Sequence, residues 1–284
     1  MTDNTISKPM SPTLSIIIIA VNEASNIEAC IRSCAFADEV LMVDSGSTDN
    51  TAFIAQSLGA KVLQTNWPGY GPQQNRGIDA SIGDWIFSLD ADERITPDLA
   101  AEIQDAIQAA TFNVFDVPRS SLYVSRFMRH SGWTPDRTRR LCKRGTARFT
   151  EHEIHANLST TYPVGHLSYP IIHYSYYDFY SVIEKMNRYS SGGARDMYAM
   201  GKRGSLSKAI THGLWAFIRT YFLRLGFLDG REGFMLAISN TEVTYYRYIK
   251  LYYLEKNQLA QNYLAQNAIQ NAHTANKNSG QGQH

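Results

Sequence analysis

The sequence predicts an α/β protein with a doubly wound, mostly parallel sheet and an amphipathic helical extension at its C-terminal end. Short apolar runs recur along the first hundred residues, and each is followed by a segment whose apolar residues have helical spacing. Repeated strand–helix units of this kind form parallel sheets, because each return to the same edge needs a crossover connection. After Ser190, apolar and basic residues alternate at helical spacing, which predicts the extension.

The composition is that of a folded globular protein and excludes several classes. Of 284 residues, 44% are hydrophobic and 19% are charged. With 27 basic and 26 acidic residues the formal net charge is +1, which excludes a polycation that coats nucleic acid. Three cysteines are too few for a disulfide framework or a four-cysteine zinc site. We expect no nucleic-acid partner.

Four apolar segments predict the strands of the sheet. The first, LSIIIIAV at residues 14–21, is continuous and rich in β-branched residues, which is typical of a strand buried on both faces. The other three are shorter and are bounded by polar or turn residues. They cover residues 40–43, 61–64 and 84–89.

Turn and capping residues predict the helices between these strands. Ser25 and Glu28 have the spacing of a capping box, and Asp49 is placed to cap the next helix. Pro97 is typical of a first helical position, and Leu99 begins an apolar face there. The expected helices cover residues 27–34, 51–58, 73–80 and a segment that begins at Pro97.

Polar residues follow three of the predicted strands. They are Asn22-Glu23 after the first, Asp44 to Ser47 after the second and Asp90 to Glu93 after the fourth. Ligands of such sheets bind beyond the carboxyl ends of the strands, so we expect these residues to form one binding site. Taken singly, an aspartate after a strand is as often a helix cap or a turn residue.

The motifs that are absent narrow the kind of site. The sequence contains neither the G-x-G-x-x-G fingerprint after its first strand nor a G-x-x-x-x-G-K-[ST] phosphate loop. We therefore expect substrate phosphates to be bound through a metal, and Asp90 with Asp92 offers carboxylates for Mg²⁺ or Mn²⁺. Asp44 can accept a hydrogen bond from a nucleobase or a ribose. The chemistry predicts a site for a nucleoside diphosphate.

Charge is unevenly distributed along the chain. Residues 79–105 hold eight acidic residues and one basic residue, whereas residues 126–148 hold eight basic residues and one acidic residue. An acidic segment followed by a basic one suggests a metal site and anionic partners, although solvated helix faces would produce the same pattern.

Eight short motifs occur in a fixed order along the chain. They are Ala20–Glu23, Val43–Asp49, Trp67–Asn75, Gly83–Asp92, Gly132–Asp136, Arg140-Leu141, His173–Tyr176 and Phe227–Gly230. Their combination resembles the family 2 inverting glycosyltransferases with the GT-A fold, and within that family the bacterial branch that adds glucose to the inner core of lipopolysaccharide. The resemblance covers about residues 14–255.

The resemblance implies roles for individual residues. Asp92 would be the principal metal ligand, assisted by Asp90, with His173 as a further metal or pyrophosphate ligand. Gln74 stands where many members of the family carry Arg or Lys. Donor-binding positions would be Ala20, Val21, Asn22, Glu23, Asp44, Gly46, Asn75, Asp90 and Ala91.

An inverting transfer also needs a carboxylate that accepts the proton of the acceptor hydroxyl. Asp136 precedes Arg140 by four residues and resembles the acidic position before the Arg-Leu pair of other family members. Its alternative role is that of a turn residue paired with Arg139 or Arg140. Glu153 is the second candidate for the base and Glu151 the third.

The C-terminal part mixes aromatic residues with Arg and Lys, as interfacial helices do at anionic membranes. A helical hairpin packed on the catalytic domain, or a dimer face, would show the same pattern, so homo-oligomerisation stays open. We expect a disordered leader at 1–13, a catalytic domain at 14–198, a membrane-associating helical region at 199–255 and a disordered polar tail at 256–284. Within the catalytic domain, residues 14–118 would bind the nucleotide sugar and residues 119–198 the acceptor.

These expectations combine into one function. The protein would transfer a hexose, with glucose expected first, from a UDP-sugar donor to a lipid-linked saccharide such as the lipopolysaccharide inner core. The sequence shows no secretory leader and no run of about 18 uncharged apolar residues, so we expect a peripheral enzyme on the cytoplasmic face of the inner membrane. Alternatives are transfer to another cell-envelope polysaccharide, a nucleotidyltransferase and a non-catalytic sugar-binding protein.

Overall fold

The computed structural model describes residues 11–150 and 156–279. These residues form two compact units. The N-terminal unit comprises residues 11–122, Phe127–Arg129 and the described part of Trp133–Ser175. The helical unit comprises Tyr123–Arg126, His130–Gly132 and residues 176–279.

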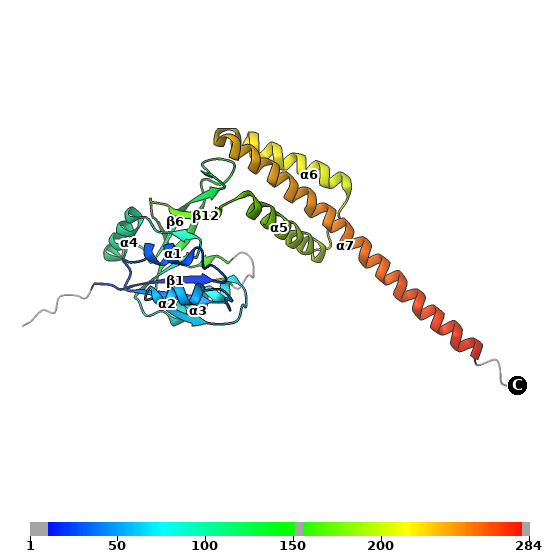
Figure 1. Ribbon diagram of the computed structural model, residues 1–284, viewed down its shortest axis with the longest axis horizontal. Coiled ribbons are helices and arrows are strands. Elements are labelled where there is room, and N and C mark those ends of the chain that lie inside the picture. Colours follow the sequence, from blue (N-terminus) through cyan, green and yellow to red (C-terminus); the bar gives the residue numbers. More distant parts are fainter. Residues whose placement is uncertain (1–10, 151–155, 280–284) are drawn as a thin grey trace, which may run out of the picture. The chain divides into compact units, whose positions relative to one another are not determined.

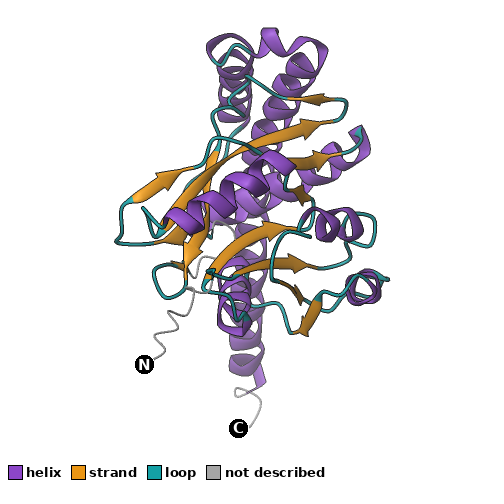
Figure 2. Ribbon diagram, turned by 90° about the vertical axis from the view of Figure 1, so that its left-hand side faces the viewer, coloured by secondary structure: helices purple, strands orange, loops and turns teal. Residues whose placement is uncertain are grey.

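The N-terminal unit is built on the four predicted parallel strands. They are β1 (Leu14–Ala20), β2 (Glu39–Asp44), β3 (Lys61–Gln64) and β4 (Trp85–Asp90), in the spatial order β3-β2-β1-β4. Every residue of β1 is buried, as expected for a central strand covered on both faces. The predicted fold class, a mostly parallel sheet with flanking helices, is confirmed (Figure 2).

Helices cover both faces of this sheet. Ile16 and Ile18 of β1 pack in one apolar cluster with side chains of α1, α2 and α4, whereas Ile17 packs on the other face with Ile78 of α3. This alternation follows from the period of two in a strand. The helices are α1 (Ile27–Ser33), α2 (Thr51–Ser57), α3 (Tyr70–Ala80) and α4 (Pro97–Ala109).

The starts of the helices agree only in part with the prediction. Pro97 opens α4 as predicted, and Thr96 caps it. At α2 the N-cap position is Asn50 rather than Asp49, although Asp49 accepts a hydrogen bond from the Thr51 N–H. The capping box of Ser25 and Glu28 does not form. Helix α1 begins two residues after Ser25, because the Glu23 carbonyl already accepts hydrogen bonds from the first N–H groups.

The second half of the N-terminal unit continues the sheet with antiparallel strands. The spatial order beyond β4 is β8-β6-β12-β5. β8 lies between β4 and β6 and runs antiparallel to both. The strands of this half are β5 (Glu93–Arg94), β6 (Val114–Tyr123), β7 (Arg126–Phe127), β8 (Arg137–Lys143), β9 (Arg148–Phe149), β10 (Leu158–Ser159), β11 (Val164–His166) and β12 (Ile171–Tyr176).

The helical unit consists mainly of α5 (Phe179–Ala199), α6 (Leu206–Ile218) and the long α7 (Gly230–Ser279), which Figure 1 shows side by side. A π-helical turn, Arg219–Leu223, and a 3₁₀ turn, Gly226–Asp229, join α6 to α7. We expected residues up to 198 to belong to the catalytic domain. Instead, α5 packs on α7, where Lys250 Nζ bonds to Asn187 and to Ser190 and Ser191.

The expected disordered tail is also different in the structure. Helix α7 continues to Ser279, well beyond residue 256, where we expected the tail to begin. Residues 256–279 contain no Gly or Pro and include five Ala and four Gln, which favour helices, beside six Asn, which do not. The polar composition predicted disorder, whereas the structure continues the helix to Ser279.

None of the helices in the described ranges is both long enough and apolar enough to cross a membrane. Cys30, Cys34 and Cys142 are buried free thiols.

Candidate functional site

The register of the parallel strands brings the expected site residues to one edge of the sheet. Ala20 at the end of β1 pairs with Asp44 at the end of β2. On the other side of β1, Ile19 pairs with Asp90, the last residue of β4. The loops that follow these three strands therefore start side by side, at the edge where such sheets bind ligands.

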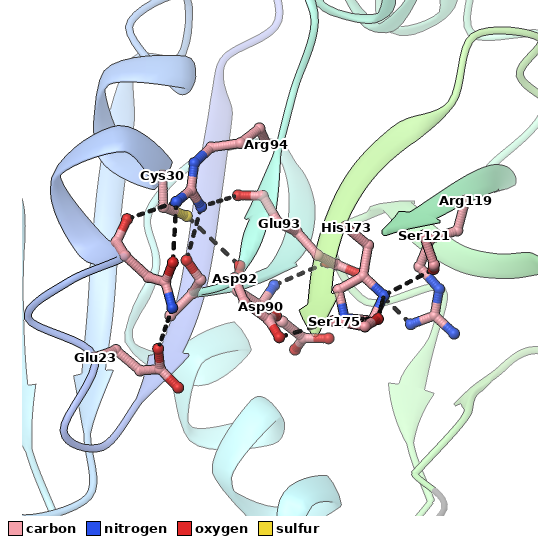
Figure 3. Close-up of polar contacts among 12 residues, drawn as sticks. Glu23, Cys30, Asp90, Asp92, Glu93, Arg94, Arg119, Ser121, His173 and Ser175 are labelled. Carbon is pink, nitrogen blue, oxygen red and sulfur yellow. Dashed lines mark hydrogen bonds and ion pairs between the residues drawn. The ribbon is translucent and has the colours of Figure 1, made fainter. Parts of the chain in front are cut away.

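The turn between β4 and β5 holds an ionic cluster, of which Figure 3 shows Asp90 and Glu93. Arg140 from β8 donates hydrogen bonds of 2.8 Å to Asp90 Oδ2 and to Glu93 Oε1. The other oxygen of Glu93 accepts a 3.0 Å bond from the Asp90 N–H. Glu93 has no exposed surface. A buried charge needs partners, and here each of the three side chains supplies a partner to another.

The cluster shifts the pKa of its members. Burial raises the pKa of Glu93 above its ordinary value, although Arg140 acts in the opposite direction. Burial would also raise the pKa of Asp90, but the charge of Arg140 and its hydrogen bond together outweigh burial, and the pKa lies below its ordinary value. Arg140 therefore favours the ionised form of Asp90, whose side chain stays one-third exposed.

Asp92 extends from the same turn toward His173 of β12. His173 Nε2 lies 3.3 Å from Asp92 Oδ2, and Nδ1 lies 3.0 Å from Ser121 Oγ and 2.8 Å from Ser175 Oγ. The contacts that the structure gives His173, which we expected as a ligand, are thus to Asp92 and two serines. Figure 3 shows this histidine beside the two aspartates.

The chemistry of these donors fits a hard divalent cation. The side chains of Asp90 and Asp92 keep 33% and 24% of their surface exposed, so their free oxygens can reach a ligand. Within residues 11–150 and 156–279, no group of three His, Cys, Asp or Glu side chains is arranged to hold a metal by itself. Mg²⁺ and Mn²⁺ commonly use one or two carboxylates and complete their coordination with water and substrate phosphate.

Asp136, the first candidate for the base, is held by Arg119 of β6. Arg119 donates to Asp136 Oδ2 from Nε at 2.8 Å, and its Nη2 lies 2.7 Å from the same oxygen. The same guanidinium lies 3.6 Å from Glu93 Oε1. Acidic and basic side chains therefore form a continuous chain of contacts, from Asp136 through Arg119, Glu93 and Arg140 to Asp90.

The sequence reasoning missed the importance of Arg119 and Glu93. It considered Arg139 or Arg140 as the partner of Asp136, whereas the partner is Arg119, which lies 17 residues away in sequence. Glu93 carried one signal, its place directly after the Asp-x-Asp of residues 90–92. The other two candidates for the base, Glu151 and Glu153, lie outside the described residues.

The expected donor-binding residues occupy two loops that bond to each other. Asn22, with a left-handed φ of 54°, donates from its N–H to Ser47 Oγ and accepts from the Thr48 N–H. Asp44 is buried, and its carboxylate accepts from the N–H and the hydroxyl of Ser47. Ala20, Val21, Glu23 and Gly46 belong to the same two segments.

The remaining expected residues lie nearby with structural partners. Asn75 of α3 exchanges two 2.9 Å hydrogen bonds with the backbone of Phe149 in β9. Its neighbour Gln74 accepts a 2.9 Å bond from Ser88 Oγ, which in turn lies 3.4 Å from Arg140 Nη1. Gln74 therefore supports the ionic cluster through Ser88. Ala91 is buried, and its carbonyl accepts a bond from Arg94.

Comparisons with known proteins add three findings. An uncharacterized glycosyltransferase of Rickettsia bellii (strain RML369-C) is 30% identical over 87% of this chain and 88% of its own length. The lipopolysaccharide core biosynthesis glycosyltransferase LpsC of Rhizobium meliloti (strain 1021) is 28% identical over 84% and 92%, respectively. The crystal structure of S. aureus TarS 1-349 aligns with a TM-score of 0.47 and 17% identity over 86% of this chain and 92% of that one.

The family profile of glycosyl transferase family 2 matches residues 15–163, which include the three strand ends, the ionic cluster and Asp136. The match covers more than half of the chain and agrees with the resemblance that the motifs suggested. This protein is a member of glycosyltransferase family 2.

Proposed function

We propose that this glycosyltransferase is an inverting enzyme that moves a hexose, glucose in the first instance, from a UDP-sugar to a lipid-linked saccharide such as the lipopolysaccharide inner core. The observation that carries the proposal is the turn after β4, where Asp90 and Asp92 offer partly exposed carboxylates at the ligand-binding edge of the sheet. The relative LpsC, named for lipopolysaccharide core biosynthesis, supports the choice of acceptor.

Asp92 and Asp90 would hold a divalent cation, Mg²⁺ or Mn²⁺. When bound, such a cation supplies Lewis-acid stabilisation of the charge that develops on the leaving diphosphate. Arg140 fixes Asp90 through the hydrogen bond to Oδ2, which leaves the second oxygen for the donor side. His173 orients Asp92 in the same way from β12. The loops of Asn22 and Ser47 lie where a nucleoside would bind, at the ends of β1 and β2.

Asp136 would accept the proton of the acceptor hydroxyl. In the transfer, the acceptor oxygen forms a bond to the anomeric carbon while the bond from that carbon to the diphosphate breaks on the opposite face, which inverts the configuration. The proton passes to the Asp136 carboxylate and UDP leaves with the electron pair of the broken bond. Arg119 orients this carboxylate by two contacts to Oδ2, so that Oδ1 is the oxygen available as base.

A lipid-linked acceptor implies work at a membrane surface, so we place the enzyme on the cytoplasmic face of the bacterial inner membrane as a peripheral protein. The aromatic and basic residues of the helical unit support this location. The UDP-sugar donor would reach the enzyme from solution on this same, cytoplasmic side of the membrane.

The test is a transfer assay with the full chain, a panel of UDP- and GDP-sugars and a detergent-dispersed lipid A core acceptor. We expect transfer from UDP-glucose, loss of activity with EDTA, recovery with Mn²⁺ or Mg²⁺, and a product of inverted anomeric configuration by NMR. Asp92→Asn should lower the rate by about 100-fold or more, since metal stabilisation of the leaving group contributes several kcal/mol. Full activity in EDTA would contradict the role of the metal, and donor binding without transfer would favour a non-catalytic sugar-binding protein.

A further inference from the structure

The turn between α6 and α7 exposes an unusual concentration of large apolar side chains. We call residues Phe222–Leu228 the hairpin tip. Its five large apolar side chains keep between 44% and 63% of their surface exposed. Large apolar patches on soluble monomers commonly mark interaction sites. The five residues are Phe222, Leu223, Leu225, Phe227 and Leu228.

The backbone under these side chains is closely packed. A Cβ at Gly233 would collide with the Gly226 carbonyl oxygen, and a Cβ at Gly226 would lie 2.7 Å from the Thr220 carbonyl oxygen. Only glycine fits at such approaches. Leu225 has a left-handed φ of 55°, a conformation that side-chain-bearing residues rarely adopt. The tip is thus a tightly built turn, and its apolar side chains are displayed outward by a fixed backbone.

Asp229 anchors the tip from inside. Its buried carboxylate accepts 2.9 Å hydrogen bonds from the His130 N–H and from Ser131 Oγ. Ser131 in turn donates from its own N–H to the Arg224 carbonyl at 2.7 Å. These bonds join the tip to the segment His130–Gly132 of the same unit. A backbone held in an uncommon conformation by such contacts points to a function for the side chains that it presents.

Charge identifies the partner of this surface. Arg219, Arg224 and Arg231 are exposed within and on either side of the tip. Of the two nearest acids, Asp229 is buried, and Glu232 accepts a hydrogen bond from Ser125 Oγ. Apolar side chains surrounded by cations match a bilayer surface with anionic headgroups. A second copy of the chain, docked symmetrically on this tip, would bring three arginines from each copy together, with Glu232 as the one partly exposed acid of each copy beside them.

We propose that the hairpin tip is a rigid wedge that inserts into the surface of an anionic membrane, with Arg219, Arg224 and Arg231 contacting the lipid phosphates. This inference rests on the proposed function for its biological purpose, because a lipid-linked acceptor is presented at such a surface. It goes further in naming the element that inserts. It also predicts a salt response: the arginine contribution is screened by salt, whereas the apolar contribution persists.

The experiment is co-sedimentation of the full chain with vesicles of phosphatidylglycerol and phosphatidylethanolamine, and with phosphatidylcholine vesicles as the neutral reference. We expect preferential binding to the anionic vesicles, weakened but not abolished at about 0.5 M salt. The double variant Phe222→Ser, Leu223→Ser should lower the partition coefficient at least about tenfold. The control is Phe53→Ser, Ile82→Ser, which removes two apolar side chains of the N-terminal unit that are more exposed than those of the tip, and it should bind as the wild type does.

Three outcomes would overturn the proposal: failure of the wild type to bind anionic vesicles, equal loss in the tip and control variants, or light scattering that shows a dimer that only the tip variant dissociates. Circular dichroism checks that each variant is folded. A second variant, Leu223→Trp, should show a blue-shifted fluorescence and quenching by brominated lipids if the tip inserts.

Sugar transfer to the detergent-dispersed acceptor separates this proposal from the proposed function. The tip variant should retain that activity while it loses vesicle binding. A wild type that binds vesicles through the tip but transfers no sugar would instead contradict the proposed function alone.

Discussion

The ionic cluster after β4 and the hairpin tip between α6 and α7 depart from the ordinary distribution of residues in opposite ways. The cluster buries charged side chains, with Glu93 wholly inside the N-terminal unit, whereas the tip exposes large apolar side chains to solvent. Both arrangements are unusual, because charged side chains are mostly exposed in folded proteins and large apolar side chains are mostly buried. The comparison teaches that departures from stable packing mark the two places where this molecule is expected to meet its substrates.

The two regions should also respond differently to substitution. In the cluster, each charge is compensated by a neighbour, so the removal of one side chain leaves another buried and unpaired. At the tip, an exposed side chain has few neighbours to lose. We therefore expect substitutions in the cluster to affect stability and catalysis together, and substitutions at the tip to affect surface binding alone.

The largest expected effect tests the catalytic end of the cluster. Asp136→Asn should lower the rate of transfer by about 10²–10⁴-fold, because the amide cannot accept the hydroxyl proton. Donor affinity, measured by calorimetry with UDP, should stay unchanged, because the base acts only when the acceptor attacks. The control is Asp116→Asn. Asp116, like Asp136, is a carboxylate paired with an arginine, in this case Arg137, and the variant should keep near-normal activity. Near-normal transfer by Asp136→Asn would direct the assignment to Glu153 or Glu151.

The next effect concerns stability. Arg140→Met should lower the free energy of unfolding by about 3–5 kcal/mol, because Glu93 would stay fully buried without its nearest cation and Asp90 would lose the same partner. The matched control is Arg148→Met, which breaks an ion pair with Asp79 whose side chains are 56% and 60% exposed, and should change stability by about 0–1 kcal/mol. Urea denaturation measures both. Equal effects of the two variants would show that the cluster is not the tightly coupled unit described above.

The same variant should change the pH dependence of stability. Without Arg140, the pKa values of Asp90 and Glu93 both rise in the folded protein, because burial then acts unopposed by its charge. A carboxyl group whose folded pKa is raised contributes stability below its unfolded pKa and loses it as pH rises through the folded pKa. The deficit of Arg140→Met relative to the wild type should therefore be smaller at about pH 4 than at about pH 7, by about 1.4 kcal/mol for each unit of pKa change. A deficit independent of pH would contradict this assignment of charge.

The fold of the N-terminal half could be predicted from local patterns. The apolar, β-branched run LSIIIIAV predicts a buried strand, which is β1. Pro97 and Leu99 predict the start of α4. The edge location of Asp44 and Asp90 followed from the parallel topology alone. These features depend on residues that are close in sequence or on rules that hold for every sheet of this kind.

The rest depends on contacts between residues far apart in sequence. The strand order β8-β6-β12-β5 and the pairing of Arg119 with Asp136 have no local signal, since any of several basic residues could have paired with that aspartate. Likewise, α5 packs on α7 through residues far apart in sequence, such as Lys250, which bonds to Asn187 and Ser191 more than 50 residues earlier. Ser25 and Glu28 had the spacing of a cap, but the Glu23 carbonyl took the N–H groups instead.

The smallest expected effect is that of a substitution at the hairpin tip, for which we expect almost no change in the free energy of unfolding. Leu223→Ser should alter the free energy of unfolding by no more than about 0.5 kcal/mol, since an exposed side chain away from special features contributes little to folding. Leu99→Ala in α4, which truncates a fully buried leucine of the sheet core, should by contrast lower it by about 2–5 kcal/mol. Both are measured by urea denaturation of the full chain in the absence of lipid. If Leu223→Ser proved as destabilising as Leu99→Ala, the tip would be part of the packed core in solution, and its apolar side chains would need no membrane to explain them.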